Sequence, residues 1–143
     1  MSTVQPAEWA HHDSVWIGFP SAPDLWLEDL EGAQAEVADF ARAVHAEGAG
    51  ERVDLVCATP EAAAVARDLA GDCASIIETP FFDIWLRDTG PIIAGTGAAR
   101  RARNFEFNWW GEKFVMPGDR EVGAALAASS GLPVDDQDWV LEG

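Results

Sequence analysis

The sequence predicts a mixed α/β fold in which strands and helices alternate along the chain. Short apolar runs bounded by Gly, Pro or Asp predict the strands, and longer segments with apolar residues at helical spacing predict the helices between them. The composition is that of a folded protein, because 48% of the 143 residues are hydrophobic and 24% are charged. A chain of this length fits one domain with a modest core.

The first strand–helix pair lies near the start of the chain. Residues 14–19 form an apolar run that ends at Pro20, a pattern that favours a buried strand. Residues 28–47 carry apolar side chains at intervals of three and four, which predicts a long amphipathic helix. The glycines at positions 48 and 50 are expected to end this helix.

A second strand–helix pair and a third strand follow directly. Residues 52–57 read as a strand, and Thr59 then offers an N-cap with a proline at the first helical position. The predicted helix spans residues 60–70 and stops at Gly71. Residues 74–78 are again apolar and β-branched, so we expect a third strand there.

The remaining chain predicts a hairpin, a helix and a last short strand. Residues 91–94 and 102–107 resemble two strands joined around a glycine-containing turn. Asp119 is expected to cap a helix that ends at Gly131, and residues 139–141 form a final strand.

The charge of the chain excludes some partners. With 25 acidic and 9 basic side chains the formal net charge is −16, which disfavours nucleic acid and anionic membrane surfaces. This charge is compatible with steering small cations, although a merely solvated acidic surface is the commoner explanation of such a charge. No apolar run is long enough to span a membrane, and residues 1–6 do not resemble a secretion signal. A cytoplasmic protein is expected.

The cysteines and histidines give little sign of catalysis or metal binding. Cys57 and Cys73 lie far apart without metal-ligand spacing, and no His is placed to activate either, so both are expected to be inert. His11, His12 and Asp13 could bind a metal, but neighbouring side chains on extended chain point in opposite directions. We expect no metal and no cofactor, and a structural His that hydrogen-bonds local backbone.

The densest group of reactive side chains lies at residues 82–91. Asp88 could bind a planar cation through both carboxylate oxygens while the indole of Trp85 stacks on that cation. A connecting loop that follows one strand and precedes another is a common place for such a site. The alternative is structural: Arg87 pairs with a neighbouring Asp, and Trp85 packs in the core.

Three ordered motifs resemble those of the agmatine deiminases, relatives of the peptidylarginine deiminases in the pentein superfamily. Residues 6–20 resemble the start of that family, with His11 where Pro is usual and Phe19 where a second Trp is common. The Asp-x-Trp-x-Arg-Asp-x-Gly-Pro motif is met at residues 83–91. Residues 107–113 match Phe-Asn-x-Trp-Gly-Gly-Lys except for Glu112, and residues 141–143 resemble the beginning of a Glu-Gly-Gly segment.

The resemblance implies a pentein fold, in which five β-α modules surround a pseudo-fivefold axis, and this chain would contain only the first modules of that ring. It implies hydrolysis of agmatine to N-carbamoylputrescine and ammonia in putrescine biosynthesis. Asp88 matches the carboxylate that grips the guanidinium, and Trp85 matches the indole that lines the substrate channel. Arg87, Asn108 and Trp110 match positions that shape the site.

The chemistry implied by the family is nucleophilic: a thiolate attacks the guanidinium carbon, a His protonates the departing ammonia, and water releases the product. In the family these groups follow the Glu-Gly-Gly segment, so residues 1–143 are expected to be an inactive N-terminal fragment of one catalytic domain. The parent enzyme is expected to act on a small cationic guanidino substrate. A homo-oligomeric parent is compatible with this expectation. Rival interpretations are a protein-arginine deiminase, a non-catalytic guanidinium-binding remnant, and a metal-dependent hydrolase using His11, His12 and Asp83.

Overall fold

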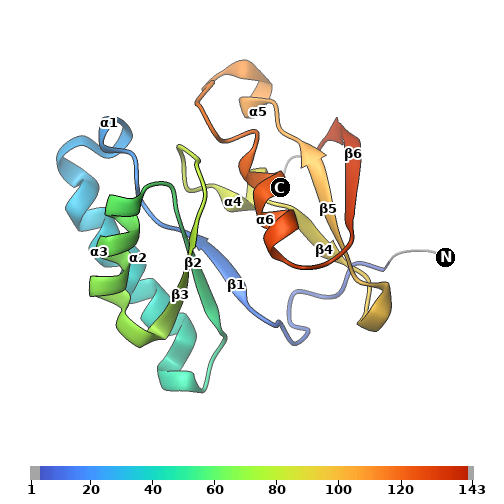
Figure 1. The fold of residues 1–143 in the computed structure, drawn as a ribbon, viewed down its shortest axis with the longest axis horizontal. Coiled ribbons are helices and arrows are strands. Elements are labelled where there is room, and N and C mark those ends of the chain that lie inside the picture. The colour runs from blue at the N-terminus through green and yellow to red at the C-terminus, as the bar shows by residue number, and fades with distance from the viewer. Residues whose placement is uncertain (1–3, 142–143) are drawn as a thin grey trace. The chain divides into compact units, whose positions relative to one another are not determined.

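A computed structural model describes residues 4–141, which divide into two compact units. One unit is a continuous segment, residues 12–85. The other combines the start of the chain, up to residue 11, with the segment that begins at residue 86. Each unit is built on its own three-stranded sheet, and Figure 1 shows the elements of both. The α/β class predicted from the sequence is confirmed.

The unit of residues 12–85 is a parallel sheet with helices between its strands. The strand order is β1-β2-β3, and both strand pairs are parallel. Its elements, in chain order, are β1 (Val15–Gly18), α1 (Pro23–Trp26), η1 (Leu27–Asp29), α2 (Leu30–His45), η2 (Ala46–Gly48), β2 (Val53–Cys57), α3 (Pro60–Ala70), η3 (Gly71–Cys73) and β3 (Ala74–Glu78).

The core of this unit lies between the sheet and helices α2 and α3. Val53, Leu55 and Cys57 alternate along the central strand β2 and are fully or almost fully buried. The helices meet them largely through alanines, whose small side chains allow close approach. The buried cluster consists of Phe19, Ala41, Val53, Leu55, Cys57, Ala62, Ala63, Ala66 and Ala70.

Local sequence signals predict this unit well. The Thr59 hydroxyl accepts a hydrogen bond from the Ala62 N–H at 3.1 Å, as an N-cap should, and α3 begins at the proline and ends at Ala70. The strand and long helix expected at residues 14–19 and 28–47 are also confirmed, as are the strands at 52–57 and 74–78. The turn-rich segment after Pro20 contains a helical turn, α1, that the sequence does not predict.

The second unit is a mixed sheet with one helix packed on it. Strand order is β4-β5-β6, with β4 antiparallel and β6 parallel to the central β5. Helix α6 contacts β5 and buries Val122, Leu126 and Ala127. The elements are α4 (Leu86–Thr89), β4 (Ile92–Ala94), η4 (Gly97–Ala99), β5 (Arg101–Glu106), α5 (Trp109–Glu112), α6 (Val122–Ser129) and β6 (Val134–Val140).

Two expectations about this unit are wrong. Asp119 does not cap α6, because the chain first makes a turn in which the Gly118 carbonyl accepts the Glu121 and Val122 N–H groups. Asp119 is instead fully buried. The last strand begins at Val134 rather than at residue 139, although its early residues are acidic. Tertiary contacts override that low strand propensity, since parallel pairing with β5 gives these residues partners.

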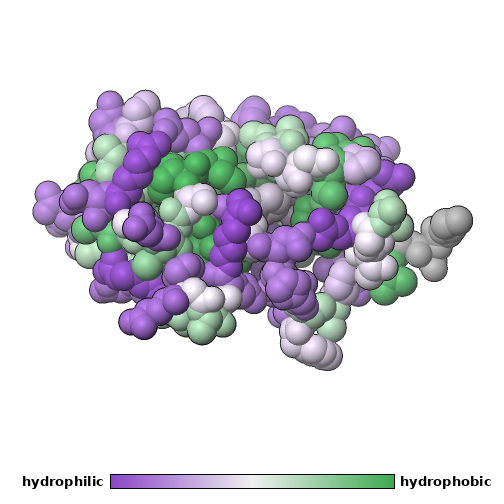
Figure 2. Space-filling view, turned by 60° about the horizontal axis from the view of Figure 1, so that its bottom comes forward, coloured by the Kyte–Doolittle hydropathy of each residue, from purple (hydrophilic) through white to green (hydrophobic). Residues whose placement is uncertain are grey.

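The surface exposes polar and apolar side chains together. Figure 2 shows patches of hydrophobic residues between charged and polar ones on one face. Exposed aromatic side chains include Trp9, Phe40, Trp85, Phe114 and Trp139. Within residues 4–141, no helix combines the length and the apolar character that crossing a membrane requires.

Candidate functional site

A small depression in the second unit gathers three of the residues singled out from the sequence. Asp88, Asn108 and Trp110 line it together with Phe107, Val140 and Leu141. The carboxylate comes from α4, the aromatic and amide groups from the end of β5 and from α5, and the aliphatic groups from the end of β6. Segments distant in the sequence therefore bring an Asp, an Asn and two aromatic residues to the same place.

Asp88 is held on a single helical turn, where a simple connecting loop was expected. Helix α4 closes with a hydrogen bond from the Gly90 N–H to the Leu86 carbonyl at 2.8 Å. A Cβ at Gly90 would lie 2.6 Å from that same carbonyl oxygen, so a side chain there would disrupt the turn. Thr89, next to Asp88, is buried. The carboxylate thus sits on tightly constrained backbone.

Asn108 and Trp110 belong to a left-handed turn. The residues from Trp109 to Glu112 all have positive φ, at 53°, 54°, 75° and 62° in order. The Asn108 side-chain oxygen accepts the Gly111 N–H at 3.0 Å, and its carbonyl accepts the Glu112 N–H at 2.7 Å. Three of the four residues are not glycine, although L side chains disfavour this conformation by about 1–2 kcal/mol each. Such strain is common at functional sites.

Aromatic rings form one wall of the depression. Phe107 meets Trp110 edge to face, with ring centroids 5.0 Å apart and planes at 90°. Trp110 in turn lies 6.4 Å from Phe114, also in T-shaped geometry. Because edge-to-face pairs restrict ring rotation, the Trp110 indole is held in a defined orientation in the depression that Asp88 also lines.

A carboxylate beside a fixed indole suits a flat cation. Carboxylate oxygens accept paired N–H groups from a guanidinium, and an aromatic face attracts the same cation through its quadrupole. The side-chain amide of Asn108 offers further hydrogen-bonding groups, although its oxygen already accepts the Gly111 N–H within the turn. The described lining contains no thiol or imidazole that would act on such a group.

Two other predicted residues are not among those that line the depression. Trp85 belongs to the unit of residues 12–85, and its side chain is 55% exposed rather than in a core. Arg87 is exposed and pairs with Glu8 at 3.1 Å, not with a neighbouring Asp. The structural alternative considered for this segment is therefore wrong in both its parts. The channel role of Trp85 and the shaping role of Arg87 stay predictions.

Neither cysteine resembles a nucleophile. Cys57 is fully buried in the sheet core, and this burial raises the pKa of its thiol from 9.0 to about 12, despite the opposing charge of Arg67. A thiol that stays protonated at neutral pH is a poor nucleophile. Cys73 lies in η3 at the end of α3 and is half-buried.

The histidine and acid positions considered for metal binding have other partners. The His12 Nδ1 lies 2.9 Å from the Glu51 carboxylate, so its partner is a side chain and not the local backbone that we expected. The Asp83 carboxylate accepts the Ile84 N–H at 2.8 Å. Among residues 4–141 no group of three His, Cys, Asp or Glu side chains is close enough to hold a metal ion.

Sequence reasoning missed part of the lining. Val140 and Leu141 reach the depression from β6, which is brought there by its parallel pairing with β5. No local signal predicts that placement. Phe107 belongs to the motif at residues 107–113 and is buried directly after β5, and its large apolar side chain at the end of a predicted strand is the signal that could have identified it.

Comparison with known proteins identifies the family of the chain. The family described as Porphyromonas-type peptidyl-arginine deiminase matches residues 4–143. A Streptomyces coelicolor relative is 34% identical over 100% of this chain, and the agmatine deiminase of Stutzerimonas stutzeri is 36% identical over 76% of it. The chain spans only 42% and 29% of the lengths of these two relatives.

Solved structures show the same backbone. The agmatine deiminase of C. jejuni superposes with a TM-score of 0.79, at 23% identity, over 99% of this chain and 41% of that protein. A variant of that enzyme solved with its substrate bound gives a TM-score of 0.80. This likeness shows the fold. The match over residues 4–143 establishes that the chain belongs to the Porphyromonas-type peptidyl-arginine deiminase family.

Proposed function

We propose that this chain supplies the guanidinium-binding part of a hydrolase that removes ammonia from agmatine and leaves N-carbamoylputrescine, a precursor of putrescine. The single observation that carries the proposal is the depression that Asp88, Asn108 and Trp110 line together. The names of similar proteins support agmatine as the substrate. The two units would be successive modules of a five-module pentein ring.

Within this proposal the described residues bind and orient the substrate. Asp88 pairs with the guanidinium N–H groups, and Trp110 faces the same group with its ring. By its place in the Asp-x-Trp-x-Arg-Asp-x-Gly-Pro motif, Trp85 is proposed to line the substrate channel. The proposal assigns the attack on the guanidinium carbon to a thiol other than Cys57, whose pKa of about 12 leaves it protonated. We therefore expect residues 1–143 to bind agmatine without turning it over.

The net charge of −16 supports a cationic substrate. Agmatine carries a guanidinium and an ammonium, so it is attracted to an acidic protein more strongly than a singly charged ligand. This attraction should weaken as salt is raised through the range in which the Debye length shortens from about 30 to 10 Å.

Calorimetric titration of the 143-residue chain with agmatine tests the proposal. Asp88→Asn removes the pairing carboxylate with little change in volume, and we expect binding to be lost. Asp68→Asn is the matched control, since Asp68 is an exposed residue of α3 in the other unit and its loss changes the net charge equally. Equal weakening by both variants, or no binding by the unaltered chain, would overturn the proposed site.

A second candidate is a deiminase acting on arginine within polypeptide, favoured by the description of the matching family. Titration with an arginine blocked at both its amino and carboxyl groups distinguishes the two. Agmatine binding at least about tenfold tighter than the blocked arginine favours the small-amine substrate, and the reverse order favours the peptide. Binding that persists without ammonia release, when the chain is assayed within its full-length protein, would indicate a non-catalytic binder.

A further inference from the structure

The left-handed turn at residues 109–112 needs support from outside itself. Its internal hydrogen bonds include one from the Lys113 N–H to the Trp109 carbonyl at 3.1 Å. These bonds close a single turn, whereas a continuing helix would add further ones. Because L residues favour the right-handed and extended regions, those conformations compete with the one observed. The population of the turn that places Asn108 and Trp110 in the depression depends on other contacts.

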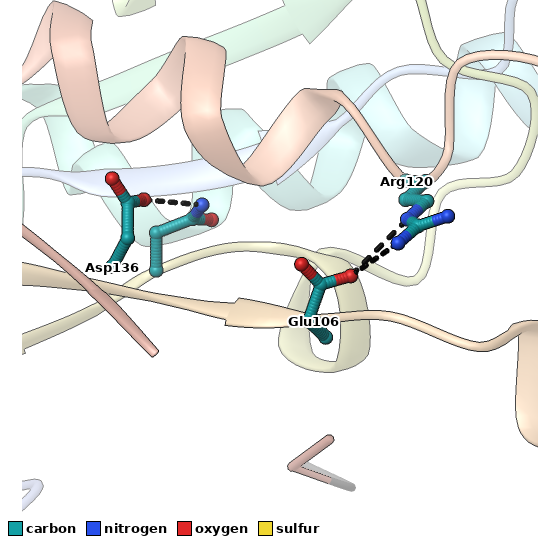
Figure 3. Close-up of polar contacts among 4 residues, drawn as sticks. Glu106, Arg120 and Asp136 are labelled. Carbon is teal, nitrogen blue, oxygen red and sulfur yellow. Dashed lines mark hydrogen bonds and ion pairs between the residues drawn. The ribbon is translucent and has the colours of Figure 1, made fainter. Parts of the chain in front are cut away.

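Arg120 makes such contacts. Its Nη2 and Nε donate to Oε2 of Glu106 at 2.6 and 3.2 Å, and Figure 3 shows this bridge between the segment before α6 and strand β5. The guanidinium carbon also lies 6.0 Å from the ring centroid of Trp109, the first left-handed residue. The indole N–H of Trp109 donates to the Met116 carbonyl at 3.0 Å. The Trp109 side chain is thus held by the Arg120 guanidinium over its ring and by the hydrogen bond from its indole N–H to Met116.

The backbone that carries Arg120 is firmly anchored. Asp119, just before it, is fully buried, and α6 starts two residues after it with the fully buried Val122. Glu106, its partner, is at the end of β5, directly before Phe107 of the depression. Arg120 therefore links a rigid helix start and a rigid strand end to the strained turn between them.

We propose that Arg120 is a positioning residue for the guanidinium site: by bridging Glu106 and Trp109 it keeps the left-handed turn in the form that presents Asn108 and Trp110 to the ligand. This inference rests on the proposed function for the identity of the ligand. Arg120 is not among the lining residues, and its positive charge would repel a cation, so its effect is exerted through the turn.

The direction in which Arg120→Gln changes agmatine affinity distinguishes a positioning role from a purely electrostatic one. Removing a positive charge near an acidic site should tighten the binding of agmatine if charge alone mattered. If Arg120 positions the turn, Arg120→Gln weakens binding instead. Because the ion pair is about half exposed, the loss should be modest, up to roughly fivefold in Kd. Arg120→Lys retains the charge and should recover part of the affinity.

A second readout needs no ligand. The Glu112 and Lys113 amide hydrogens are bonded only while the turn is formed, so their exchange with solvent, followed by NMR, reports its population. Arg120→Gln and Glu106→Gln should each speed this exchange roughly fivefold, and the double variant should add little, as expected when the two partners act through one ion pair.

Arg67→Gln is the matched control. It breaks an ion pair of similar exposure, Arg67 to Glu78 at 2.8 Å, in the other unit. This variant should leave both the exchange of the Glu112 amide and agmatine affinity unchanged. Equal effects of Arg67→Gln and Arg120→Gln would indicate a general loss of stability and would overturn the inference.

The remaining outcomes distinguish failure of the positioning role of Arg120 from failure of the proposed function. Unchanged exchange and unchanged or tighter agmatine binding in Arg120→Gln would reject the positioning role, while loss of binding in Asp88→Asn alone would leave the proposed function standing. If the unaltered chain does not bind agmatine but Arg120→Gln speeds exchange at residues 112 and 113, the proposed function fails and the role of Arg120 in holding the turn stands.

Discussion

Gly123 on α6 lies directly against Thr89, the residue that follows Asp88: a Cβ at position 123 would be 2.5 Å from the Thr89 carbonyl oxygen. The same Cβ would be 2.7 Å from the side-chain oxygen of Asn104, whose amide nitrogen bonds Asp136 at 3.0 Å. Figure 3 labels Asp136 in this contact. The close approach of α6 therefore supports the turn that carries the carboxylate of the site.

Gly123→Ala should destabilise the chain and displace α4. Backbone must move, because the nearest atom is a carbonyl oxygen and not the end of a flexible side chain, and the cost is expected at about 1–3 kcal/mol. Urea unfolding measures it. Gly32→Ala is the control, since Gly32 lies in α2 with open space around it and should gain about 0.5–1 kcal/mol. Loss of stability in both variants would contradict this account.

Glu112→Gly should stabilise the chain, against the usual effect of introducing glycine. At φ 62° a glutamate is strained and a glycine is not, so we expect a gain of about 1 kcal/mol after allowing for the greater freedom of the unfolded chain. The same substitution at Glu36, an exposed residue within α2, should instead cost about 1 kcal/mol. Thermal unfolding of the two variants checks the opposite signs.

The buried thiol of Cys57 should make stability depend on alkaline pH. Burial raises its pKa in the folded chain to about 12, above the value of 9.0 for a free thiol. The protonated thiol therefore favours the folded state fully below pH 9, and this contribution is lost as pH rises from there toward 12. The free energy of unfolding should fall by at most about 1.4 kcal/mol per pH unit in that range.

Cys57→Ala removes the titrating group and provides the comparison. Urea midpoints of both proteins between pH 7 and 10.5 should diverge in slope above pH 9, with the steeper fall in the unaltered chain. Parallel curves would indicate that the Cys57 thiol titrates near its ordinary value. Native alkylation at pH 8 should correspondingly spare Cys57 and label it only after unfolding.

Thr59→Ala should cost about 1 kcal/mol, because the Thr59 hydroxyl caps α3 by accepting the Ala62 N–H. Thr96 is the matched control: it precedes the short helix η4 but makes no capping bond, so Thr96→Ala should change the unfolding free energy by less than about 0.5 kcal/mol. Equal losses would show that the measured cost comes from the loss of any threonine and not from the cap.

The sequence predicts those parts of the fold in which local signals agree. The Thr59 cap, the period of α2 and the apolar run of β2 each act over a few residues, and all are confirmed. The start of β6 could not be predicted, since the acids Asp135 and Asp136 become part of a strand only through Arg103 and Asn104 on β5. Nor does any local signal beyond Gly111 indicate a left-handed turn.

The candidate site also combines residues that the sequence predicts with residues that only tertiary contacts bring there. Asp88, Asn108 and Trp110 were identified from motifs, and the structure shows that three short segments bring them together with Val140 and Leu141. The aliphatic members could not be found from sequence, because only the β5–β6 pairing carries them there. Likewise, the support given by Arg120 depends on an ion pair to Glu106 across a long connection.

The strand pairings also predict the order in which contacts form during folding. Val15 pairs with Val53, and Ala102 with Val134, so each of these parallel contacts must first close a long connection that contains a helix. Ile93 pairs with Ala102 through a short turn. Hairpins form within microseconds, whereas contacts distant in sequence slow folding. We therefore expect the β4–β5 hairpin to form first during refolding, and β6 to complete the depression last.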